Sequence, residues 1–372
     1  MLCMNGQSAN EKDAAFWLAW SHILESRQLK KLFDHFANGE EAWQAPEHEL
    51  QNLGFQAETL QNISAKRRQL DPERVLEKVL KADIQTVCLG DPNYPARLAQ
   101  IYDAPVVLFY RGRLPVNEEI LIAIVGTRMA SRYGQTAAVT FTRELAQGGL
   151  GIVSGLARGI DALAHETTLE VGGRTIGVLG NGLLNSDIYP REYVKLAQKI
   201  IERGGCIMAE YPPGIGPERH HFPERNRIIA GLTVGTLVIE APETSGALIT
   251  AKLALEYNRE VMAVPGNIFE KNSMGTNDLI KLGARMVTSA ADIKEALQLQ
   301  NIMETKIERR PEVSKDEAVI LNILSKNPIH IDMVYKNAGL NSSTVGGILT
   351  LLELKGAVKD VGGKYYIRLI EP

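Results

Sequence analysis

Apolar residues recur at three- and four-residue intervals through the first part of the chain. The pattern is clearest over residues 14–23, 29–36 and 72–80, where few positions are β-branched. Such spacing places the apolar side chains on one face of a helix. The sequence therefore predicts a small helical domain over residues 1–82.

A different pattern runs through residues 83–298, where short β-rich apolar runs alternate with amphipathic segments. Buried strands that alternate with helices are typical of a parallel sheet covered on both faces. The predicted fold class is therefore α/β, with a doubly wound parallel sheet. Strands are predicted at residues 121–126, 150–154, 175–179, 206–210, 235–240 and 261–264, and helices at 135–146, 160–169, 193–201, 223–230, 246–257 and 277–282.

The segment that precedes this pattern is rich in proline. Residues 84–115 contain short apolar runs interrupted by Pro92, Pro95, Pro105 and Pro115. Proline is poorly tolerated inside a helix, so long helices are not expected here. We predict an extended lead-in to the sheet.

Helical spacing returns after a polar and charged stretch at residues 299–312, which is predicted to be a linker. Helices are expected at 319–324, 331–338 and 342–354, followed by two strands around the Gly362-Gly363 turn. This order indicates a winged-helix domain over residues 313–372. Its third helix has no basic residue before Lys355, so we expect it to contact protein, or duplex DNA only weakly.

The charge composition excludes a protein that is basic over its whole surface. The 372 residues include 41 Lys and Arg against 44 Asp and Glu, which gives a formal net charge of -3. No apolar run is long enough to span a bilayer, so we expect a cytoplasmic, unprocessed protein without membrane insertion. Cys3, Cys88 and Cys206 are too widely separated for a disulfide framework or a metal site.

Glycine-rich loops that contain arginine follow the first two predicted strands of the sheet. VGTRMASRYGQ contains Gly126, Thr127 and Arg128, and SGLARGIDALAH contains Arg158 and Gly159. In a doubly wound sheet such loops meet at one edge, and each leads into a helix whose first amides favour an anion. We therefore expect phosphate binding here. For either loop alone, a plain strand-to-helix turn is the alternative.

Asp161 and His165 lie four residues apart on the helix after the second loop. They could form a catalytic pair or provide two metal ligands. A packed pair inside the fold is favoured, because no third ligand stands at a recognisable spacing. The sequence accordingly predicts neither a metal site nor a catalytic residue.

The segment PERHHFPERNRIIAGL concentrates positive charge around one aromatic residue. Arg219, Arg225 and Arg227 surround Phe222, which stands at the start of a predicted helix. Arginines that contact phosphates beside a ring that stacks on a base are typical of single-strand binding sites. The alternative for Phe222 is a core residue that packs against the following helix.

A further loop, EAPETSGALITAKLALE, places Ser245 and Gly246 at a helix start and Lys252 two turns along. Ser245 could be only a helix cap, whereas Gly246 also lets the backbone approach a ligand. The sequence contains no Walker motif, no G-x-G-x-x-G after the first strand and no G-x-S-x-G elbow. We therefore expect a site that binds phosphates without transforming them and without a cofactor.

A series of motifs follows in order between residues 84 and 290: IVGTRMASRYG, SGLARGIDALAH, TIGVLGNG with IYP, AEYPPG, FPERNRIIAGL, LVIEAPETSGALITAKLALE, VMAVPGNIF and GTNDLIKLGA. Together they closely resemble the bacterial DNA-processing protein A family, also called Smf. The resemblance implies an extended Rossmann-like fold, preceded by a sterile-alpha-motif-like helical domain and followed by a winged-helix domain. It also implies a homodimer that binds single-stranded DNA, loads RecA recombinase onto it and displaces single-strand-binding protein during natural transformation.

The resemblance also assigns roles to particular residues. It implies that Leu279 and Ile280 lie at the dimer interface, with burial against the sheet as the alternative. One departure is the loop GNGLLNSDIYP, which is longer than the family's usual G-L-D-x-x-Y-P run. The DNA-binding motifs of the family correspond here to Gly126, Thr127 and Arg128, to Arg219, Phe222, Arg225, Asn226 and Arg227, and to Ser245, Gly246 and Ala247.

An enzyme is the alternative from another class of protein. The same type of sheet occurs in nucleotide-binding phosphoribohydrolases that resemble lysine decarboxylases. Those enzymes carry a P-G-G-x-G-T-x-x-E loop, whereas the nearest stretch in this chain is TVGTLVIEAPETSG. The sequence therefore favours a DNA-binding protein that is not an enzyme.

Overall fold

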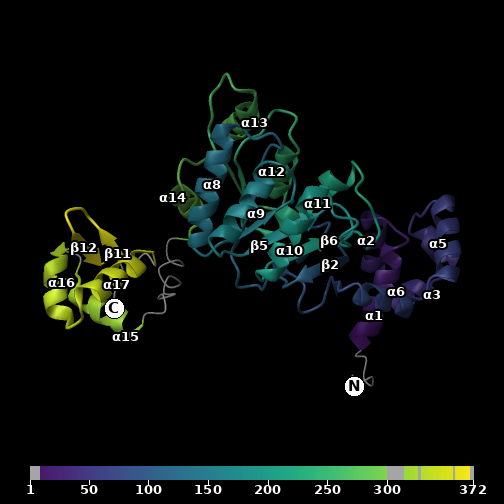
Figure 1. The fold of residues 1–372 in the computed structure, drawn as a ribbon. Helices are drawn as coiled ribbons and strands as arrows, with labels where there is room; N and C mark the ends of the chain where they lie inside the picture. Colours follow the sequence, from purple (N-terminus) through teal and green to yellow (C-terminus); the bar gives the residue numbers. More distant parts are fainter. Residues whose placement is uncertain (1–8, 300–313, 326–327, 355–356, 369–372) are drawn as a thin grey trace, which may run out of the picture. The chain divides into compact units, whose positions relative to one another are not determined.

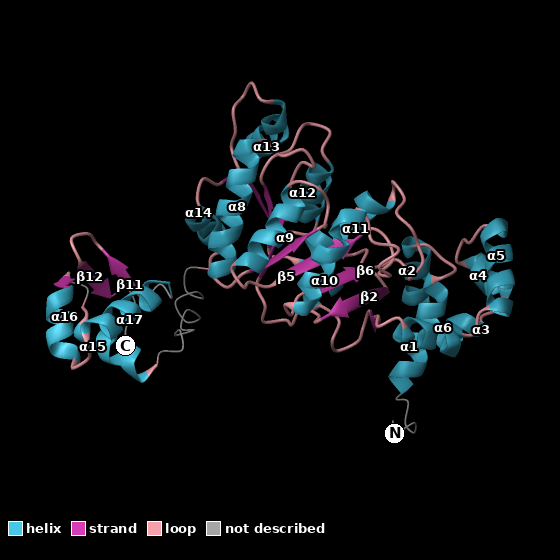
Figure 2. Ribbon diagram, in the orientation of Figure 1, coloured by secondary structure: helices cyan, strands magenta, loops and turns pink. Residues whose placement is uncertain are grey.

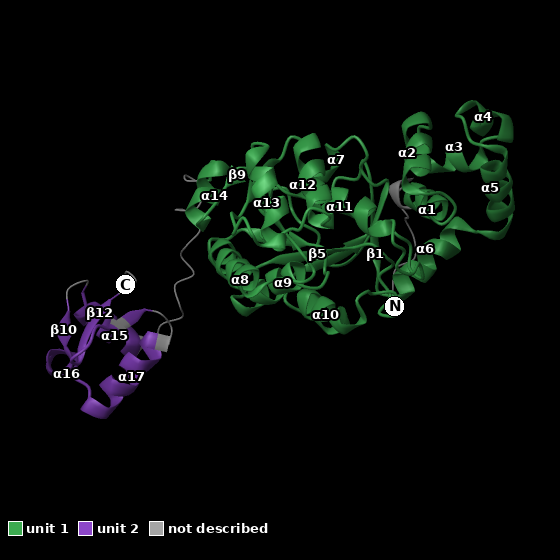
Figure 3. Ribbon diagram, turned by 90° about the horizontal axis from the view of Figure 1, so that it is seen from above, with its two compact units in different colours: residues 1–304 green, residues 305–372 purple. Residues whose placement is uncertain are grey.

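A computed structural model describes residues 9–299, 314–325, 328–354 and 357–368 of the chain. The chain divides into two compact units, residues 1–304 and residues 305–372 (Figure 3). Each unit is described by itself.

The first unit is built on a nine-stranded sheet among the described residues, with strand order β1-β2-β6-β5-β4-β3-β7-β8-β9. All neighbouring strands from β6 to β9 in this order pair in parallel. This confirms the predicted parallel α/β sheet. The chain adds β4, β5 and β6 on one side of β3 and then returns to add β7 on the other. The strands are β1 Gln85–Cys88, β2 Val107–Gly112, β3 Leu121–Val125, β4 Gly151–Ser154, β5 Thr175–Leu179, β6 Cys206–Ala209, β7 Gly235–Val238, β8 Glu260–Ala263 and β9 Arg285–Met286.

Both faces of the central strands are buried, because helices cover the sheet on each side (Figures 1 and 2). Along β3 the side chains alternate between two cores, one that includes Leu121 and Ala123 and one that includes Ile122 and Ile124. This alternation follows from the two-residue repeat of a strand. One face carries α8 Arg132–Gln147, α9 Ile160–Glu170 and α10 Val194–Glu202, and the other carries α7 Ala96–Ala99, α11 His221–Leu232 and α12 Gly246–Glu256.

Three further helical segments of the described chain belong to the sheet region. A single 3-10 turn, η1 Arg191–Tyr193, precedes α10, and α13 Lys271–Lys281 follows β8. Helix α14 Ala290–Ala296 begins at a capping box made by Ser289 and Asp292, and its Ile293 packs into the core under α8. These caps satisfy amides that a helix start leaves without partners.

The proline-rich segment before the sheet is not a simple lead-in, so that prediction is corrected. It contributes the two antiparallel edge strands, with β1 paired to β2 and β2 paired to β6. Its prolines lie outside the strands, where they do not remove a ladder hydrogen bond. Leu108 and Phe109 of β2 are fully buried. The sheet is therefore mixed at this edge rather than parallel throughout.

The N-terminal residues are helical, as the sequence predicts. Trp17, Trp20 and Leu32 are buried in a core that also contains Phe109 and Ile207 of the sheet. The predicted boundary at residue 82 therefore lies inside one compact unit, and the likeness to a sterile alpha motif stays a prediction. The helices are α1 Ala9–Ser21, α2 Ser26–His35, α3 Gly39–Gln44, α4 Glu47–Asn52, α5 Ala57–Gln69 and α6 Pro72–Lys81.

The second unit is a winged-helix domain, as predicted. Its sheet has the order β10-β12-β11, and its core includes Ile320, Val334 and Leu349. Asn341 caps α17 by accepting a hydrogen bond from the Thr344 amide at 2.8 Å. The elements are α15 Lys315–Ile323, β10 Ile329–His330, α16 Ile331–Ala338, α17 Ser342–Leu354, β11 Val358–Asp360 and β12 Tyr365–Arg368.

The structure describes two of the three cysteines. Cys88 and Cys206 are buried free thiols, and burial raises the pKa of Cys206 to about 12. Cys3 and nearly all of the predicted linker at 299–312 lie outside the described residues. Within the described ranges, no helix has both the length and the apolar character needed to span a membrane.

Candidate nucleic-acid interface

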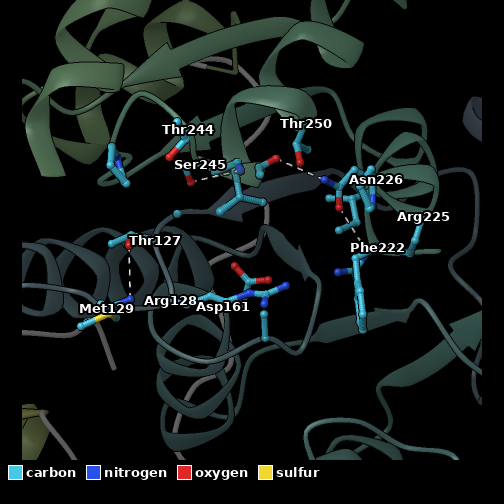
Figure 4. Close-up of a pocket in the computed structure, with 18 of the residues that line it drawn as sticks. Thr127, Arg128, Met129, Asp161, Phe222, Arg225, Asn226, Thr244, Ser245 and Thr250 are labelled. Atoms are coloured by element: carbon cyan, nitrogen blue, oxygen red, sulfur yellow. Dashed lines mark hydrogen bonds between the residues drawn. The ribbon is translucent and has the colours of Figure 1, made fainter. Parts of the chain in front are cut away.

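An open groove of about 1050 Å³ lies at the carboxyl edge of the sheet, where the chain switches from one side of β3 to the other (Figure 4). Ligands of doubly wound sheets bind at such a switch point. The loops after β3 and β7 and the first turns of α11 and α12 form its walls. The sequence-predicted residues that line it are Gly126, Thr127, Arg128, Arg219, Phe222, Arg225, Asn226, Ser245, Gly246 and Ala247.

Backbone contacts hold the loop after β3 against its neighbours. The Thr127 amide donates to the Glu240 carbonyl oxygen at 2.7 Å, and the Thr127 hydroxyl accepts from the Met129 amide at 3.2 Å. Gly159, at the start of α9, has φ +76°, and a Cβ there would clash with the Thr127 carbonyl oxygen. Gly159 does not line the groove. Its role here is to let the second glycine loop approach the first.

The start of α8 already holds a negative charge supplied by the protein. Glu240 is 3 % exposed, and its carboxylate accepts from the Ser131 amide at 2.9 Å and the Ser131 hydroxyl at 2.6 Å. The Ser131 hydroxyl accepts in turn from the Gly134 amide at 3.1 Å. A carboxylate at a helix N-terminus is favoured by the helix dipole. Glu240 therefore occupies the helix start where the sequence predicts a phosphate, and that prediction is corrected.

One wall of the groove is aromatic. Phe222 is half-buried in the first turn of α11, so it does not belong to the fully buried core. The Arg128 guanidinium lies over its ring, 5.6 Å from the centroid, and the Tyr189 ring lies 6.0 Å from it. Figure 4 shows Arg128 and Phe222 on the groove walls. The arrangement combines a π-face with a cation at one position.

The opposite wall is the N-terminus of α12. The Ser245 hydroxyl caps the helix by accepting from the Ala247 amide at 3.3 Å. Asn226 on α11 donates to the Gly246 carbonyl oxygen at 3.2 Å and so ties the two helix starts together. A Cβ on Gly246 would meet nothing within 4 Å, which leaves open space beside the backbone. Among the described residues, no carboxylate accepts a hydrogen bond from this helix start, in contrast to α8.

Arg225 and Asp161 lie deep in the floor of the groove. Arg225 is 4 % exposed and donates to the Gly155 carbonyl oxygen at 2.8 Å and to the Val178 carbonyl oxygen. Asp161 accepts from the Gly155 amide at 3.1 Å. Burial lowers the pKa of Arg225 to about 10 and raises the pKa of Asp161. Arg225 therefore has most of its donors engaged by the protein, and its main effect is to order the floor.

Arg227 lies inside the fold and not in the groove, which corrects the DNA contact that the sequence predicts. Its side chain is 8 % exposed, and it forms an ion pair with Glu210 at 2.7 Å and with Asp103 at 3.6 Å. It also donates to the Ser26 hydroxyl of α2 at 2.7 Å. Burial lowers the pKa of Arg227, but Glu210 and Asp103 more than offset this effect and raise it. Arg227 does not line the groove.

Two other predicted basic contacts also lie outside the groove lining. Arg158 is exposed and forms a two-bond pair with Glu192, at 2.8 and 2.9 Å. Lys252 is exposed on α12, 4.0 Å from Glu256. Arg158 was expected to face phosphates because its loop follows a predicted strand, and Lys252 because it lies two turns along the helix after another such loop. Neither side chain is among the residues that line the groove.

Asp161 and His165 each bond to a separate partner inside the fold. His165 is fully buried, and its Nδ1 lies 2.7 Å from the Thr175 hydroxyl of β5. Burial lowers the pKa of His165 to about 3, so the ring is neutral. The structure thus shows a histidine that is buried and bonded inside the fold, which is part of the alternative that the sequence favoured.

Sequence reasoning missed several residues that line the groove. Tyr189 stands in the IYP motif, which was recognised without a role for its ring. Lys271 and Asn272 begin α13, and the Asn272 side chain donates to the Met129 carbonyl oxygen at 2.9 Å. Nothing in the local sequence signals that contact, because Asn272 and Met129 lie 143 positions apart in the chain. The exposed basic side chains that line the groove are Arg128, Arg219 and Lys271.

The fold and the groove define a Rossmann-like protein with a cationic, partly aromatic switch-point site. The chain belongs to the DNA recombination-mediator protein A family, whose model matches residues 85–298. A second family model, the DprA winged helix domain, matches residues 305–364.

Relatives and solved structures agree with this family. The Smf protein of Synechocystis is 41 % identical over 77 % of this chain and 73 % of its own length, and that of Escherichia coli is 40 % identical over 73 % and 74 %. The crystal structure of DNA processing protein A from Streptococcus pneumoniae matches with a TM-score of 0.66 and 34 % identity, covering 78 % of this chain and 98 % of that chain. The Helicobacter pylori protein, whose structure is described for its single-stranded DNA binding mode, matches with a TM-score of 0.52 and 29 % identity, covering 58 % and 96 %.

Proposed function

We propose that this protein binds single-stranded DNA in the groove at the carboxyl edge of its sheet. The proposal rests on one wall of the groove, where the Arg128 guanidinium carbon lies 5.6 Å from the centroid of the Phe222 ring. This wall lies opposite the open start of α12. A ring can stack on a base, and a cation beside it can contact the adjoining phosphate. The single-stranded DNA binding described for the Helicobacter pylori relative supports the same ligand.

Phosphates are proposed to bind on the opposite wall and at the groove rim. The first amides of α12 carry the positive end of the helix dipole, and Gly246 leaves the backbone accessible. Arg128, Arg219 and Lys271 add three exposed positive charges. These contacts are to the sugar-phosphate chain, so sequence preference is expected to be slight.

Binding should weaken with salt in proportion to the phosphates neutralised. Three cations in the groove predict a slope of about -2 for the logarithm of the binding constant against the logarithm of salt concentration, since single strands release about 0.7 counterions per phosphate. Fluorescence anisotropy of a labelled single strand over a salt series measures this slope. The Arg128→Ala protein should give a shallower slope, whereas Lys252→Ala should match the unchanged protein. Affinity independent of salt would contradict the proposal.

We further propose that the bound strand is handed to RecA recombinase, with displacement of single-strand-binding protein, in the cytoplasm during transformation. Membership of the recombination-mediator family supports this role. The test is RecA filament formation on a strand coated with single-strand-binding protein. Filaments should form faster when this protein is added. An unchanged rate would argue against RecA loading while leaving DNA binding intact.

The proposed active form is a homodimer that contacts its partner through α13. Leu279 and Ile280 are half-buried there, and Leu279 also packs against the sheet core. Leu282, just after the helix, is 85 % exposed. Sedimentation at micromolar concentration should show a dimer, and a monomer would contradict this part of the proposal.

We propose that the groove binds DNA without catalysing a reaction on it. The two groups that the sequence offered for chemistry, Asp161 and His165, are both buried and bonded within the fold. The winged-helix domain is proposed to contact protein, or duplex DNA weakly, because α17 contains no basic residue. Release of free base from nucleoside monophosphates would favour the phosphoribohydrolase alternative, and we expect none.

A further inference from the structure

A cluster of potential metal ligands lies at the rim of the groove, in the segment that leads into α11. Glu218, His220 and His221 each offer one ligand atom, and these atoms all lie within 4.8 Å of one another. In the part of the chain that the structure describes, no other group of three His, Cys, Asp or Glu side chains has this property. Glu218 also lines the groove, so the cluster and the groove share a wall.

Local structure gathers the three side chains on one turn. The His221 amide donates to the Glu218 carbonyl oxygen at 3.2 Å, which closes the turn. The Glu218 carboxylate lies 3.5 Å from the Nδ1 of His220, and the two imidazole rings have centroids 4.5 Å apart. The cluster is therefore a consequence of backbone geometry and not only of side-chain orientation.

His221 provides a rigid anchor for the cluster. It is 7 % exposed, and its ring stacks on Tyr211 with 3.9 Å between centroids. The Tyr211 hydroxyl donates to Glu224 at 2.9 Å, which fixes the stacking partner. Among the described residues, the Nδ1 of His221 has no hydrogen-bond partner. Buried polar atoms in proteins are usually bonded, so this nitrogen remains available to a further partner.

We propose that Glu218, His220 and His221 bind one divalent transition-metal ion of the Zn²⁺ type at the groove entrance. Two imidazoles and a carboxylate are a ligand set that zinc uses when it keeps a fourth position open. Ligand atoms around tetrahedral zinc lie about 3.3 Å apart. Glu218 and His220 have exposed side chains, which can turn to close the remaining gap onto the anchored His221.

Glu218 lines the groove that we propose to be a DNA site, so an ion held by the cluster could present an open position to a bound strand, and this second step rests on the proposed function. A phosphate oxygen is a suitable fourth ligand for the ion. The ion would thus add positive charge beside Arg219 and Phe222, where the protein itself supplies Glu218. Zn²⁺ is accordingly expected to tighten single-strand binding.

Isothermal titration calorimetry of the untagged full chain with Zn²⁺, without DNA, tests the metal site. We expect one ion per chain, with affinity lowered about tenfold or more in both His220→Ala and Glu218→Gln. His48→Ala is the matched control, because it removes an exposed histidine of α4 and should leave the affinity unchanged. Absence of binding, or equal binding by His220→Ala and the unchanged protein, would overturn the site.

Anisotropy titrations of a single strand with and without Zn²⁺ test the second step separately. Zn²⁺ should raise the DNA affinity of the unchanged protein and of His48→Ala, but not that of His220→Ala. Calorimetric binding without any effect on DNA affinity would overturn the phosphate contact and leave a structural ion. Failure of DNA binding under all conditions would contradict the proposed function, whereas the calorimetric result would still decide the metal site.

Discussion

Replacing Arg227 by alanine is expected to lower the free energy of unfolding by about 3–5 kcal/mol. The Arg227 side chain is 8 % exposed, and it neutralises Glu210, whose side chain is 11 % exposed. Without the guanidinium, Glu210 would remain as a buried carboxylate with only the Ser26 hydroxyl as its partner. The same guanidinium also donates to the Asp103 carbonyl oxygen at 3.0 Å. The substitution would therefore break the links from α11 to two distant segments.

Chemical denaturation at neutral pH measures this loss, and Arg158→Ala is the matched control. Arg158 also pairs with a glutamate, but both side chains are about half exposed, at 57 % and 49 %. An exposed pair of this kind contributes about 0–1 kcal/mol. Equal losses in the two variants, or a loss below about 1 kcal/mol for Arg227→Ala, would show that Arg227 is not a structural residue.

Replacing Phe222 by alanine is expected to weaken single-strand binding by about 1–3 kcal/mol, or about 5- to 160-fold. The half-buried ring lines the groove and offers a face to a base, so its loss removes stacking without opening a core cavity. The cation over the ring, Arg128, would also lose its partner. The unfolding transition should change little.

Anisotropy titrations of Phe222→Ala and Phe222→Tyr separate stacking from packing. The tyrosine variant keeps the π-face and should bind close to the unchanged affinity. Circular dichroism during thermal unfolding provides the stability control. Unchanged DNA affinity in Phe222→Ala, or a large loss of stability, would show instead that Phe222 is a core residue that packs against the following helix.

The central sheet and its loops could be predicted from the sequence because their signals are local. Residues 121–125 form an unbroken apolar run, and they appear as the fully buried strand β3. The glycines that follow such runs mark the carboxyl edge, where Gly126 and Gly246 both line the groove. Strands β1 and β2 were missed because they lie among prolines, and because β2 pairs with the distant β6.

The orientation of individual arginines was harder to predict, for reasons of helix geometry. Residues two apart on a helix do not share a face, so Arg225 and Arg227 cannot both point into the groove. Phe222, Arg225 and Asn226 are spaced by three and four residues and do share the groove face. The partners that hold Arg227 come from α2, the residue after β6 and the β1–β2 connection, and no local pattern predicts them.

Competition between a single strand and the duplex of the same sequence tests whether a strand enters the groove. A strand in the groove can stack an unpaired base on Phe222, which a paired base cannot do. Fluorescence anisotropy at one salt concentration should show the single strand bound about 5- to 160-fold more tightly than the duplex, and the difference should shrink in Phe222→Ala. Equal affinity for the two forms, or tighter binding of the duplex, would contradict the account.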